Sequence, residues 1–246
     1  MKLFLPIIAY GGQIHTEYMI SMMNLMQSLI KNNMSATFHP ITSESLISRG
    51  RNSAAAFFLQ SDSDYMLFVD TDMSFTVDDF NEVAKLKKPL SIGAYCKKYI
   101  NQSKLESYAK LNPEFKSDWK QYVTDFSTEI PPNVTPEKHI KVKYGATGFM
   151  LIHRSVFETI IKRKPELKYR NDIDFYSGGG DNFYDFFSVR VNPDTKKYES
   201  EDYGFCQLWR ECGGVIHCAT DTNLVHIGRQ HYTGNLYKQL KSMNNA

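Results

Sequence analysis

Five residues in a row, Tyr65-Met66-Leu67-Phe68-Val69, constrain the fold of this 246-residue chain more than any other segment. A strand buried on both faces of a parallel sheet is apolar throughout, whereas a half-exposed strand alternates apolar and polar residues. The run therefore predicts a central strand with helices packed on both sides, which is the α/β class. It ends in Asp70-Thr71-Asp72, so two carboxylates lie at one edge of the expected sheet.

Strand-like and helix-like patterns alternate through the first 95 residues. Apolar residues spaced as on one helical face run from Met19 to Ile30, and we expect them to pack in the core. In such doubly wound sheets, ligands bind beyond the carboxyl ends of the strands, where both Tyr10-Gly11 and Asp70-Thr71-Asp72 lie. The expected strands cover residues 3–9, 36–39, 65–69 and 90–95, and the other expected helices cover 46–59 and 77–86.

The second half of the chain is less regular. Residues 97–141 lose the alternating pattern and contain four prolines, so we expect a long surface loop there. We predict one domain with a mixed sheet and loop insertions. The expected elements that follow are a strand over 142–153, a helix from Ser155, a second loop-rich region over 169–197, a helix over 201–212, and short strands over 215–218 and 224–227.

The charge and the cysteine content of the chain limit which binding partners and which cellular compartment are expected. Lys and Arg number 29 against 27 Asp and Glu, so a nucleic-acid partner is not expected. No run approaches the ~18 apolar residues that span a membrane, and we interpret residues 1–9, which include Pro6, as a strand rather than a signal peptide. The four cysteines form no CxxC pair, so we favour small buried residues over metal ligands and expect a reduced, cytoplasmic setting.

Asp70 and Asp72 form the strongest candidate site for a metal ion. Two carboxylates one residue apart at a strand end can converge on a hard divalent cation, which prefers oxygen ligands and can bridge to substrate phosphates. The alternative is a turn or helix cap that contains two aspartates. The position directly after a buried apolar strand favours the metal site.

Two further motifs contain candidate functional residues, but their patterns are less specific than that of Asp70 and Asp72. Glu201 and Asp202 begin a predicted helix, where the helix dipole favours carboxylates, and one of them could also serve as a general base. His226 follows an apolar strand and is either a core histidine or a further metal ligand. The other candidate histidines are His153, His217 and His231, and the cations that could neutralise phosphates are Arg49, Arg51, Lys143 and Arg229.

Five segments, in this order, resemble glycosyltransferases with the GT-A fold. The subgroup that they resemble most comprises the small viral and bacterial enzymes related to family 2 transferases. The resemblance covers nearly the whole chain, is thin over residues 97–141, and leaves open a virus-encoded protein that acts in the host cytoplasm. The segments are Ser48-Arg49-Gly50-Arg51-Asn52, residues 66–72, Gly148-Phe149-Met150-Leu151-Ile152, residues 200–206, and His226-Ile227-Gly228.

The resemblance implies a single GT-A domain over 1–246, with a nucleotide-binding half (1–96), an insertion (97–141) and an acceptor half (142–246). It implies a nucleotide-sugar donor, most often a uridine diphosphate sugar, and Mn²⁺ or Mg²⁺. Asp72 and His226 would hold the metal, and Asp70 would assist the metal or hold the ribose. The implied donor-site residues are Ala9, Tyr10, Gly11, Arg51, Asp70 and Thr71.

The resemblance also implies the chemistry at the acceptor. Asp202 would remove the proton of an acceptor hydroxyl on a carbohydrate or glycan, with inversion at the anomeric carbon. Gly148, Phe149 and Glu201 would border the sugar and the acceptor. The family's C-terminal extension is short here, so we expect the acceptor contacts to come from the two loop regions.

Three alternatives remain open. A retaining transferase on the same fold needs no base, so Asp202 would be structural. A sugar-nucleotide nucleotidyltransferase should carry a glycine-rich, basic loop after the first strand, which Tyr10-Gly11-Gly12-Gln13 matches poorly. The third is a non-enzymatic carbohydrate-binding or structural protein on a decayed transferase fold, which the presence of Asp70, Asp72, Asp202 and His226 disfavours.

Aromatic residues make up 13% of the chain and concentrate in the two loop regions. Because rings stack on sugar faces, we predict that several of them form the walls of the acceptor cleft. They are Tyr95, Tyr99, Tyr108, Phe115, Trp119, Tyr122 and Phe126 in or beside the first region, and Tyr169, Phe175, Tyr176, Phe183, Tyr184, Phe186, Phe187 and Tyr198 in the second.

Overall fold

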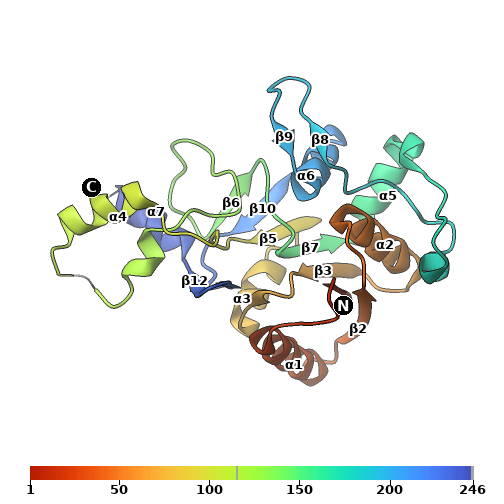
Figure 1. The fold of residues 1–246 in the computed structure, drawn as a ribbon, viewed down its shortest axis with the longest axis horizontal. Coiled ribbons are helices and arrows are strands. Elements are labelled where there is room, and N and C mark those ends of the chain that lie inside the picture. The colour runs from red at the N-terminus through yellow and green to blue at the C-terminus, as the bar shows by residue number, and fades with distance from the viewer. Residues whose placement is uncertain (115, 245–246) are drawn as a thin grey trace.

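The computed structural model describes residues 1–114 and 116–244. Its centre is a seven-stranded sheet in the order β2-β1-β3-β7-β5-β10-β6 (Figure 1). The strands are β1 (Lys2–Ala9), β2 (Ser35–Thr42), β3 (Tyr65–Val69), β5 (Leu90–Gly93), β6 (His139–Val142), β7 (Phe149–His153) and β10 (Ile216–Ala219). The helices are α1 (Thr16–Lys31), α2 (Ile47–Gln60), α3 (Val77–Ala84), α4 (Gln102–Leu111), α5 (Arg154–Arg163), α6 (Glu201–Glu211) and α7 (Leu236–Asn244).

The predicted α/β class with a mixed sheet is confirmed. β1 runs parallel to β2 and β3, and β5 runs parallel to β10. β7 lies antiparallel between β3 and β5, and β6 lies antiparallel to β10 at the edge. These two reversals make the sheet mixed.

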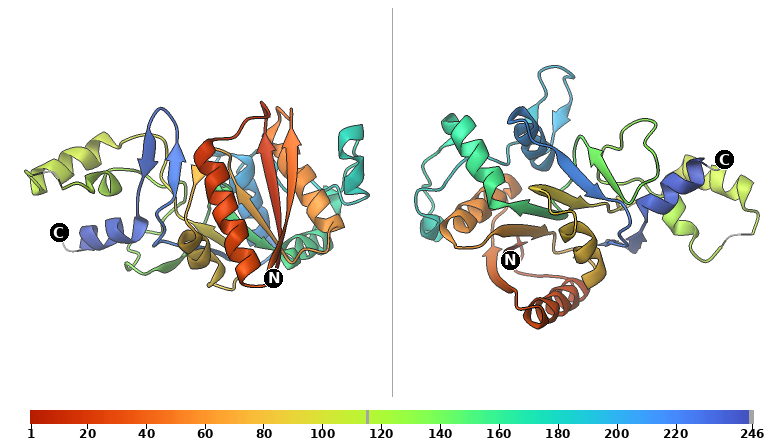
Figure 2. Two further views of the ribbon diagram at one scale, coloured as in Figure 1. Left: turned by 90° about the horizontal axis from the view of Figure 1, so that it is seen from below. Right: turned by 180° about the vertical axis from the view of Figure 1, so that it is seen from behind.

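Alternate residues of β3 face two separate cores. Met66 and Phe68 belong to the core beneath α2, α5 and α6, whereas Leu67 and Val69 belong to the core beneath α1 and α3. Figure 2 shows α1 and α2 on opposite sides of the strands. The continuous apolar run is thus explained by burial on both faces.

The methionine-rich face of α1 is only partly buried. Met22 lies in the core with Leu25 and Leu29, but Met19 and Ile30 are 45% and 65% exposed. The prediction that this whole stripe packs in the core is therefore wrong. The apolar spacing correctly predicted a helix. Only part of its apolar face packs against the sheet, and the rest is exposed.

The single strand expected over residues 142–153 is also wrong, because the chain forms two strands there. β6 ends at Val142 on the sheet edge, and β7 begins at Phe149 in its centre. Two glycines allow the crossing to pass close to its neighbours. A Cβ on Gly145 would lie 2.2 Å from Ile92 Cδ1, and a Cβ on Gly148 would lie 2.4 Å from the Tyr95 hydroxyl.

The insertion over 97–141 is not a loop throughout. It contains α4, a 3-10 helix η1 (Trp119–Tyr122) and most of β6. The Asn101 side chain begins α4 by accepting a hydrogen bond from the Lys104 backbone N–H at 3.1 Å. Lys104 Nζ in turn donates to Gln239 of α7 at 2.9 Å. Figure 1 shows α4 and α7 together at one end of the molecule.

The second loop region, over residues 169–197, contains η3 (Asp174–Gly179) and β8 (Arg190–Val191). It is preceded by η2 (Pro165–Leu167) and followed by β9 (Tyr198–Glu199), which pairs antiparallel with β8. Some of the loop aromatics are buried in the two cores, and others are exposed. That several of the loop aromatics form the walls of an acceptor cleft stays a prediction. Phe115 lies outside the described residues. The buried ones are Tyr95, Phe126, Tyr176, Phe183, Phe186 and Phe187, and the exposed ones are Tyr99, Phe175 and Tyr198.

The cysteines and helices of the described residues bear on two further expectations. Cys96, Cys206, Cys212 and Cys218 are all buried free thiols, so the interpretation as small buried residues is confirmed. None of the helices in the described part of the chain has the length and apolar character needed to cross a membrane.

Candidate functional site

The candidate site lies where β1 and β3 end. After β1 the chain turns at Gly12, whose φ of 67° favours glycine and whose N–H donates to the Ala9 carbonyl at 2.9 Å. The turn leaves Tyr10 67% exposed, with its carbonyl accepting from the Ser43 N–H at 3.0 Å. An exposed ring at the end of a parallel strand is available to stack on a flat ligand.

A second, small sheet brings Asp72 and His226 together. β4 (Met73–Ser74) follows Asp72 directly and pairs antiparallel with β11 (Val225–Ile227), which also pairs with β12 (His231–Thr233). The register sets His226 opposite Met73, and the Ile227 N–H donates to the Asp72 carbonyl at 2.7 Å. His226 Nε2 then lies 3.7 Å from Asp72 Oδ1.

The ring of His226 is oriented by the backbone of Cys96. Nδ1 lies 2.9 Å from the Cys96 carbonyl, which can only accept, so the ring donates from Nδ1. The other ring nitrogen, Nε2, faces Asp72 and is the atom available to a metal. A histidine held in this way by a backbone carbonyl is typical of metal ligands.

Asp72 is held as a carboxylate. Burial alone would raise its pKa, but His226 and Lys98 outweigh burial and lower the pKa to about 2. The Lys98 ammonium contacts Oδ2 of Asp72, and His226 contacts Oδ1. Asp72 therefore carries its charge throughout the neutral range, as a metal ligand must.

The two donors Asp72 and His226 fit a divalent cation that shares its coordination with a substrate. No group of three or more His, Cys, Asp or Glu side chains suited to a metal occurs within the described residues. Mg²⁺ is commonly held by one or two protein ligands together with substrate phosphates and water, so a complete protein cage is not required. The carboxylate oxygen and the imidazole nitrogen also suit Mn²⁺.

Arg51 connects the end of β3 to the start of α6. Its side chain is 5% exposed, and it contacts Asp70 Oδ1 through Nη2 at 3.0 Å and Glu201 Oε1 through Nε at 3.2 Å. Burial alone would lower the pKa of the guanidinium, but Asp70 and Glu201 raise it. Asp70 therefore faces Arg51, whereas Asp72 faces His226.

Asp202 lies in the first turn of α6, next to the Arg51 contact. Its Oδ1 accepts from the Tyr203 N–H at 2.8 Å and contacts the Ser200 hydroxyl. Burial raises the pKa of Asp202, and the neighbouring Glu201 raises it further, against the opposing effects of Ser200 and Arg51. A carboxylate with a raised pKa has the character of a general base.

The remaining predicted site residues divide into two groups. The Gly148 carbonyl accepts from the Asp70 N–H at 3.3 Å, and the Thr71 carbonyl accepts from the His15 N–H at 3.3 Å, so both residues adjoin the end of β3. Ala9 is buried beneath this edge. The Phe149 side chain is fully buried, with its ring 5.0 Å from that of Phe75, so it belongs to the core and not to the lining of the site.

Sequence reasoning missed one group that contacts the site. Lys98, in the insertion, is the cation that contacts Asp72, and nothing in its local sequence sets it apart from other lysines. Arg49, a candidate phosphate cation, is instead paired with buried Glu44, which also accepts from the Tyr176 hydroxyl at 2.8 Å. Neither contact of Glu44 leaves a local signal, because Glu44 lies before α2 and the five-residue spacing to Arg49 is not that of helical neighbours.

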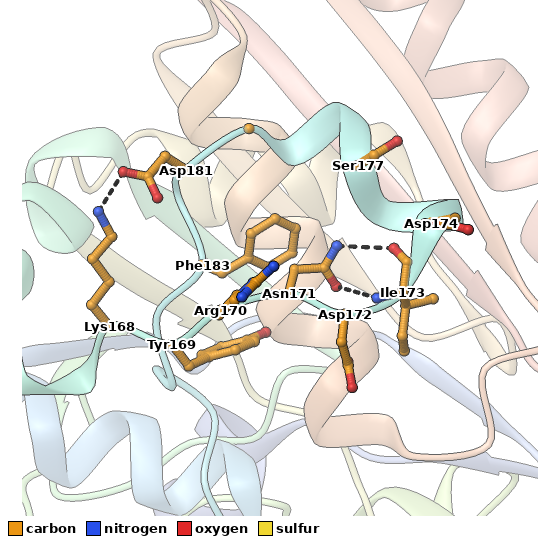
Figure 3. Close-up of a pocket in the computed structure, with 11 residues that line it drawn as sticks. Lys168, Tyr169, Arg170, Asn171, Asp172, Ile173, Asp174, Ser177, Asp181 and Phe183 are labelled. Carbon is orange, nitrogen blue, oxygen red and sulfur yellow. Dashed lines mark hydrogen bonds and ion pairs between the residues drawn. The ribbon is translucent and has the colours of Figure 1, made fainter.

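A large cavity of about 860 Å³ lies elsewhere, in the second loop region. Figure 3 shows that its lining comes from one segment, with Lys168 paired to Asp181 and the Asn171 side chain bonded to the backbone of Ile173. None of the residues at the ends of β1 and β3 or on β11 lines it. The candidate site is therefore taken at the sheet edge, where the pKa values of Asp72 and Asp202 are shifted.

No protein-family model matches the chain, and no curated protein sequence matches it. Among solved structures, A197 from STIV aligns with 96% of this chain and 95% of its own, at 15% identity and a TM-score of 0.50. GalNAc-T7, solved with UDP, GalNAc and Mn²⁺, aligns with 93% of this chain and 44% of its own, at 9% identity and a TM-score of 0.47. The 4-diphosphocytidyl-2C-methyl-D-erythritol synthase of Anaerococcus prevotii DSM 20548 aligns with 71% of this chain and 80% of its own, at 10% identity and a TM-score of 0.33.

The chain has a GT-A-like fold, as its sequence motifs predict. The likeness to A197 extends over nearly the whole length of both chains, and at 15% identity it concerns the fold alone. An activity has to be argued from the side chains at the sheet edge.

Proposed function

We propose that the protein is a glycosyltransferase that moves a sugar from a nucleotide diphosphate donor, preferably a uridine diphosphate sugar, to a carbohydrate or glycan acceptor with inversion. The observation that carries the proposal is the convergence of two sets of residues at one sheet edge. Asp72 and His226 form a pair suited to a cation, and Arg51 links that edge to Glu201, the neighbour of the half-buried carboxylate Asp202. These are the parts that transfer from a diphosphate leaving group requires.

The donor would lie across the ends of β1 and β3. The exposed ring of Tyr10 would stack on the base, with the backbone of Ala9 and Gly11 beside it. Asp70 and Thr71 would hold the ribose. Arg51 would stabilise negative charge near the diphosphate, although it already forms ion pairs with two carboxylates.

Asp72 and His226 would hold the metal. Asp70 pairs with Arg51, so it would assist the metal only weakly. A bound Mn²⁺ or Mg²⁺ supplies positive charge that stabilises the leaving diphosphate. Asp72 contributes a carboxylate that stays ionised to about pH 2, and the Cys96 carbonyl keeps Nε2 of His226 free to coordinate.

Asp202 would act on the acceptor, which Gly148 and Glu201 would border. As the acceptor hydroxyl attacks the anomeric carbon from the face opposite the diphosphate, its proton passes to the Asp202 carboxylate. The raised pKa of Asp202 favours this role over a structural one, because a stronger base accepts a proton more readily. That observation supports inversion over retention.

Asp72→Ala tests the donor site. We expect this variant to lose Mn²⁺-dependent binding of a uridine diphosphate sugar by more than about 100-fold, since even outer-shell changes at metal sites typically reduce affinity 10–100-fold. The measurement is calorimetric titration of the donor with and without Mn²⁺. Asp62→Ala is the matched control, because Asp62 also contacts a lysine but is 81% exposed and remote from the site. Equal donor affinity in wild type and Asp72→Ala would refute the metal assignment.

The pH dependence of turnover tests the base. Asp202 must be ionised to accept a proton, so kcat falls as the pH drops through its pKa. Since that pKa is raised above the ordinary 3.8, we expect the acid limb of the kcat profile to lie above pH 3.8. A profile that stays flat down to pH 3.8, in a protein that remains folded there, would exclude Asp202 as the base.

A further inference from the structure

Lys98 lies against the candidate metal pair. It follows β5 in the insertion, and its ammonium contacts Asp72 Oδ2. Its methylene groups lie beside Gly228, where an added Cβ would be 3.1 Å from Lys98 Cδ. The lysine side chain is 37% exposed, so the ammonium can leave Asp72 for solvent or for a bound anion.

The backbone that carries Lys98 is firmly held. The N–H of the preceding Lys97 donates to the Asp125 carbonyl at 2.7 Å, and the hydroxyl of the following Tyr99 donates to Asp125 Oδ2 at 2.6 Å. Lys104 also pairs with the Asp125 carboxylate at 2.8 Å. The Lys98 ammonium can therefore move because the lysine side chain is flexible, and not because the loop moves.

The ammonium and a divalent cation compete for the same carboxylate. A cation held between Asp72 Oδ1 and His226 would place two positive charges beside a carboxylate whose other oxygen, Oδ2, already contacts the Lys98 ammonium. Two positive charges that share one carboxylate repel each other strongly. A diphosphate would relieve this repulsion, because it offers the ammonium a new anionic partner next to the metal.

We propose that Lys98 is a built-in counter-cation that competes with the divalent metal for Asp72 and transfers to the donor diphosphate, so that metal and nucleotide bind cooperatively. The inference rests on the proposed function and extends it to the order of assembly. Without nucleotide, Lys98 neutralises Asp72 and weakens metal binding. With nucleotide, Lys98 pairs with phosphate and the metal takes its place at Asp72.

The test is titration of Mn²⁺, followed by electron paramagnetic resonance, with no nucleotide present. We expect Lys98→Met to bind Mn²⁺ about fivefold or more tightly than wild type. A change of this size corresponds to the loss of one competing ion pair whose strength is near the upper end of the values measured for exposed ion pairs. Lys98→Arg keeps the charge and should bind Mn²⁺ as weakly as wild type. Lys97→Met removes a neighbouring exposed charge and should leave Mn²⁺ affinity close to the wild-type value.

The second arm repeats the titration with saturating UDP. We expect UDP to tighten Mn²⁺ binding more in wild type than in Lys98→Met, because the variant lacks the group that couples the two ligands. Equal Mn²⁺ affinity in wild type and Lys98→Met without UDP would overturn the role of Lys98 while leaving the metal site intact. Absence of Mn²⁺ binding in both proteins, with and without UDP, would instead overturn the metal site of the proposed function.

Discussion

Replacing Asp202 with asparagine is expected to lower kcat by about 10²–10⁴-fold, the usual contribution of a general base. The amide keeps the size of the carboxylate and can still accept from the Tyr203 N–H, so the start of α6 should be preserved. We therefore expect Asp202→Asn to fold and to bind the donor like wild type. The measurement is steady-state transfer to an accepted sugar, with donor affinity determined in parallel.

A matched control separates loss of the base from loss of charge. Asp194 is an exposed carboxylate between β8 and β9, and Asp194→Asn should turn over at the wild-type rate. Full activity in Asp202→Asn would remove Asp202 from the mechanism and revive a retaining reaction. Loss of donor binding in the same variant would place Asp202 in the donor site instead.

Replacing Arg51 with methionine is expected to lower the free energy of unfolding by about 3–5 kcal/mol, which is the usual effect of removing one partner from a buried ion pair. Arg51 is 5% exposed and neutralises both Asp70 and Glu201, so the variant leaves two carboxylates without their cation. Methionine retains much of the apolar stem beside the Phe68 ring. The measurement is urea unfolding at neutral pH.

The control for Arg51→Met is Lys2→Met, which removes the cation of an exposed pair with Asp62. Its effect should stay below about 1 kcal/mol. Neutralising one stranded carboxylate, in Arg51→Met with Glu201→Gln, should recover part of the lost stability. If Arg51→Met unfolds at the wild-type urea concentration, Arg51 does not hold the end of β3 and the start of α6 together.

The parts of the fold that could be predicted from sequence are those governed by local patterns. The bounds of β3 match the apolar run at Tyr65–Val69, because burial on both faces demands that composition. The three-residue spacing of Thr76 and Asp79 is that of a capping box, and both of its hydrogen bonds are present at the start of α3. The helix after Ser200 also begins where its acidic first turn indicates.

The parts that could not be predicted depend on distant segments. The division between β6 and β7 rests on the packing of Gly145 and Gly148 against Ile92 and Tyr95, contacts that leave no local periodicity. The partly exposed face of α1 likewise depends on where the sheet stops. Apolar spacing identifies a helix, but it does not state how much of the helix is covered.

The same division applies to the candidate site. Asp72 could be chosen because it comes soon after an apolar strand, and His226 because it lies in an apolar segment near the C-terminal end, but the register of β4 with β11 that brings them together is a tertiary property. Lys98 could not be chosen, since its significance lies in a contact with Asp72 across 26 residues of sequence. Local sequence therefore identified the carboxylates and missed the cation that balances one of them.

The most direct test of the account is a donor panel with the purified wild-type protein. Uridine and guanosine diphosphate sugars are titrated calorimetrically with and without Mn²⁺, and release of free nucleoside diphosphate by slow donor hydrolysis is followed in the same samples. We expect at least one uridine diphosphate sugar to bind in a Mn²⁺-dependent manner and to release UDP slowly. Absence of binding and of nucleotide release across the whole panel, with and without Mn²⁺, would contradict the proposed glycosyltransferase activity.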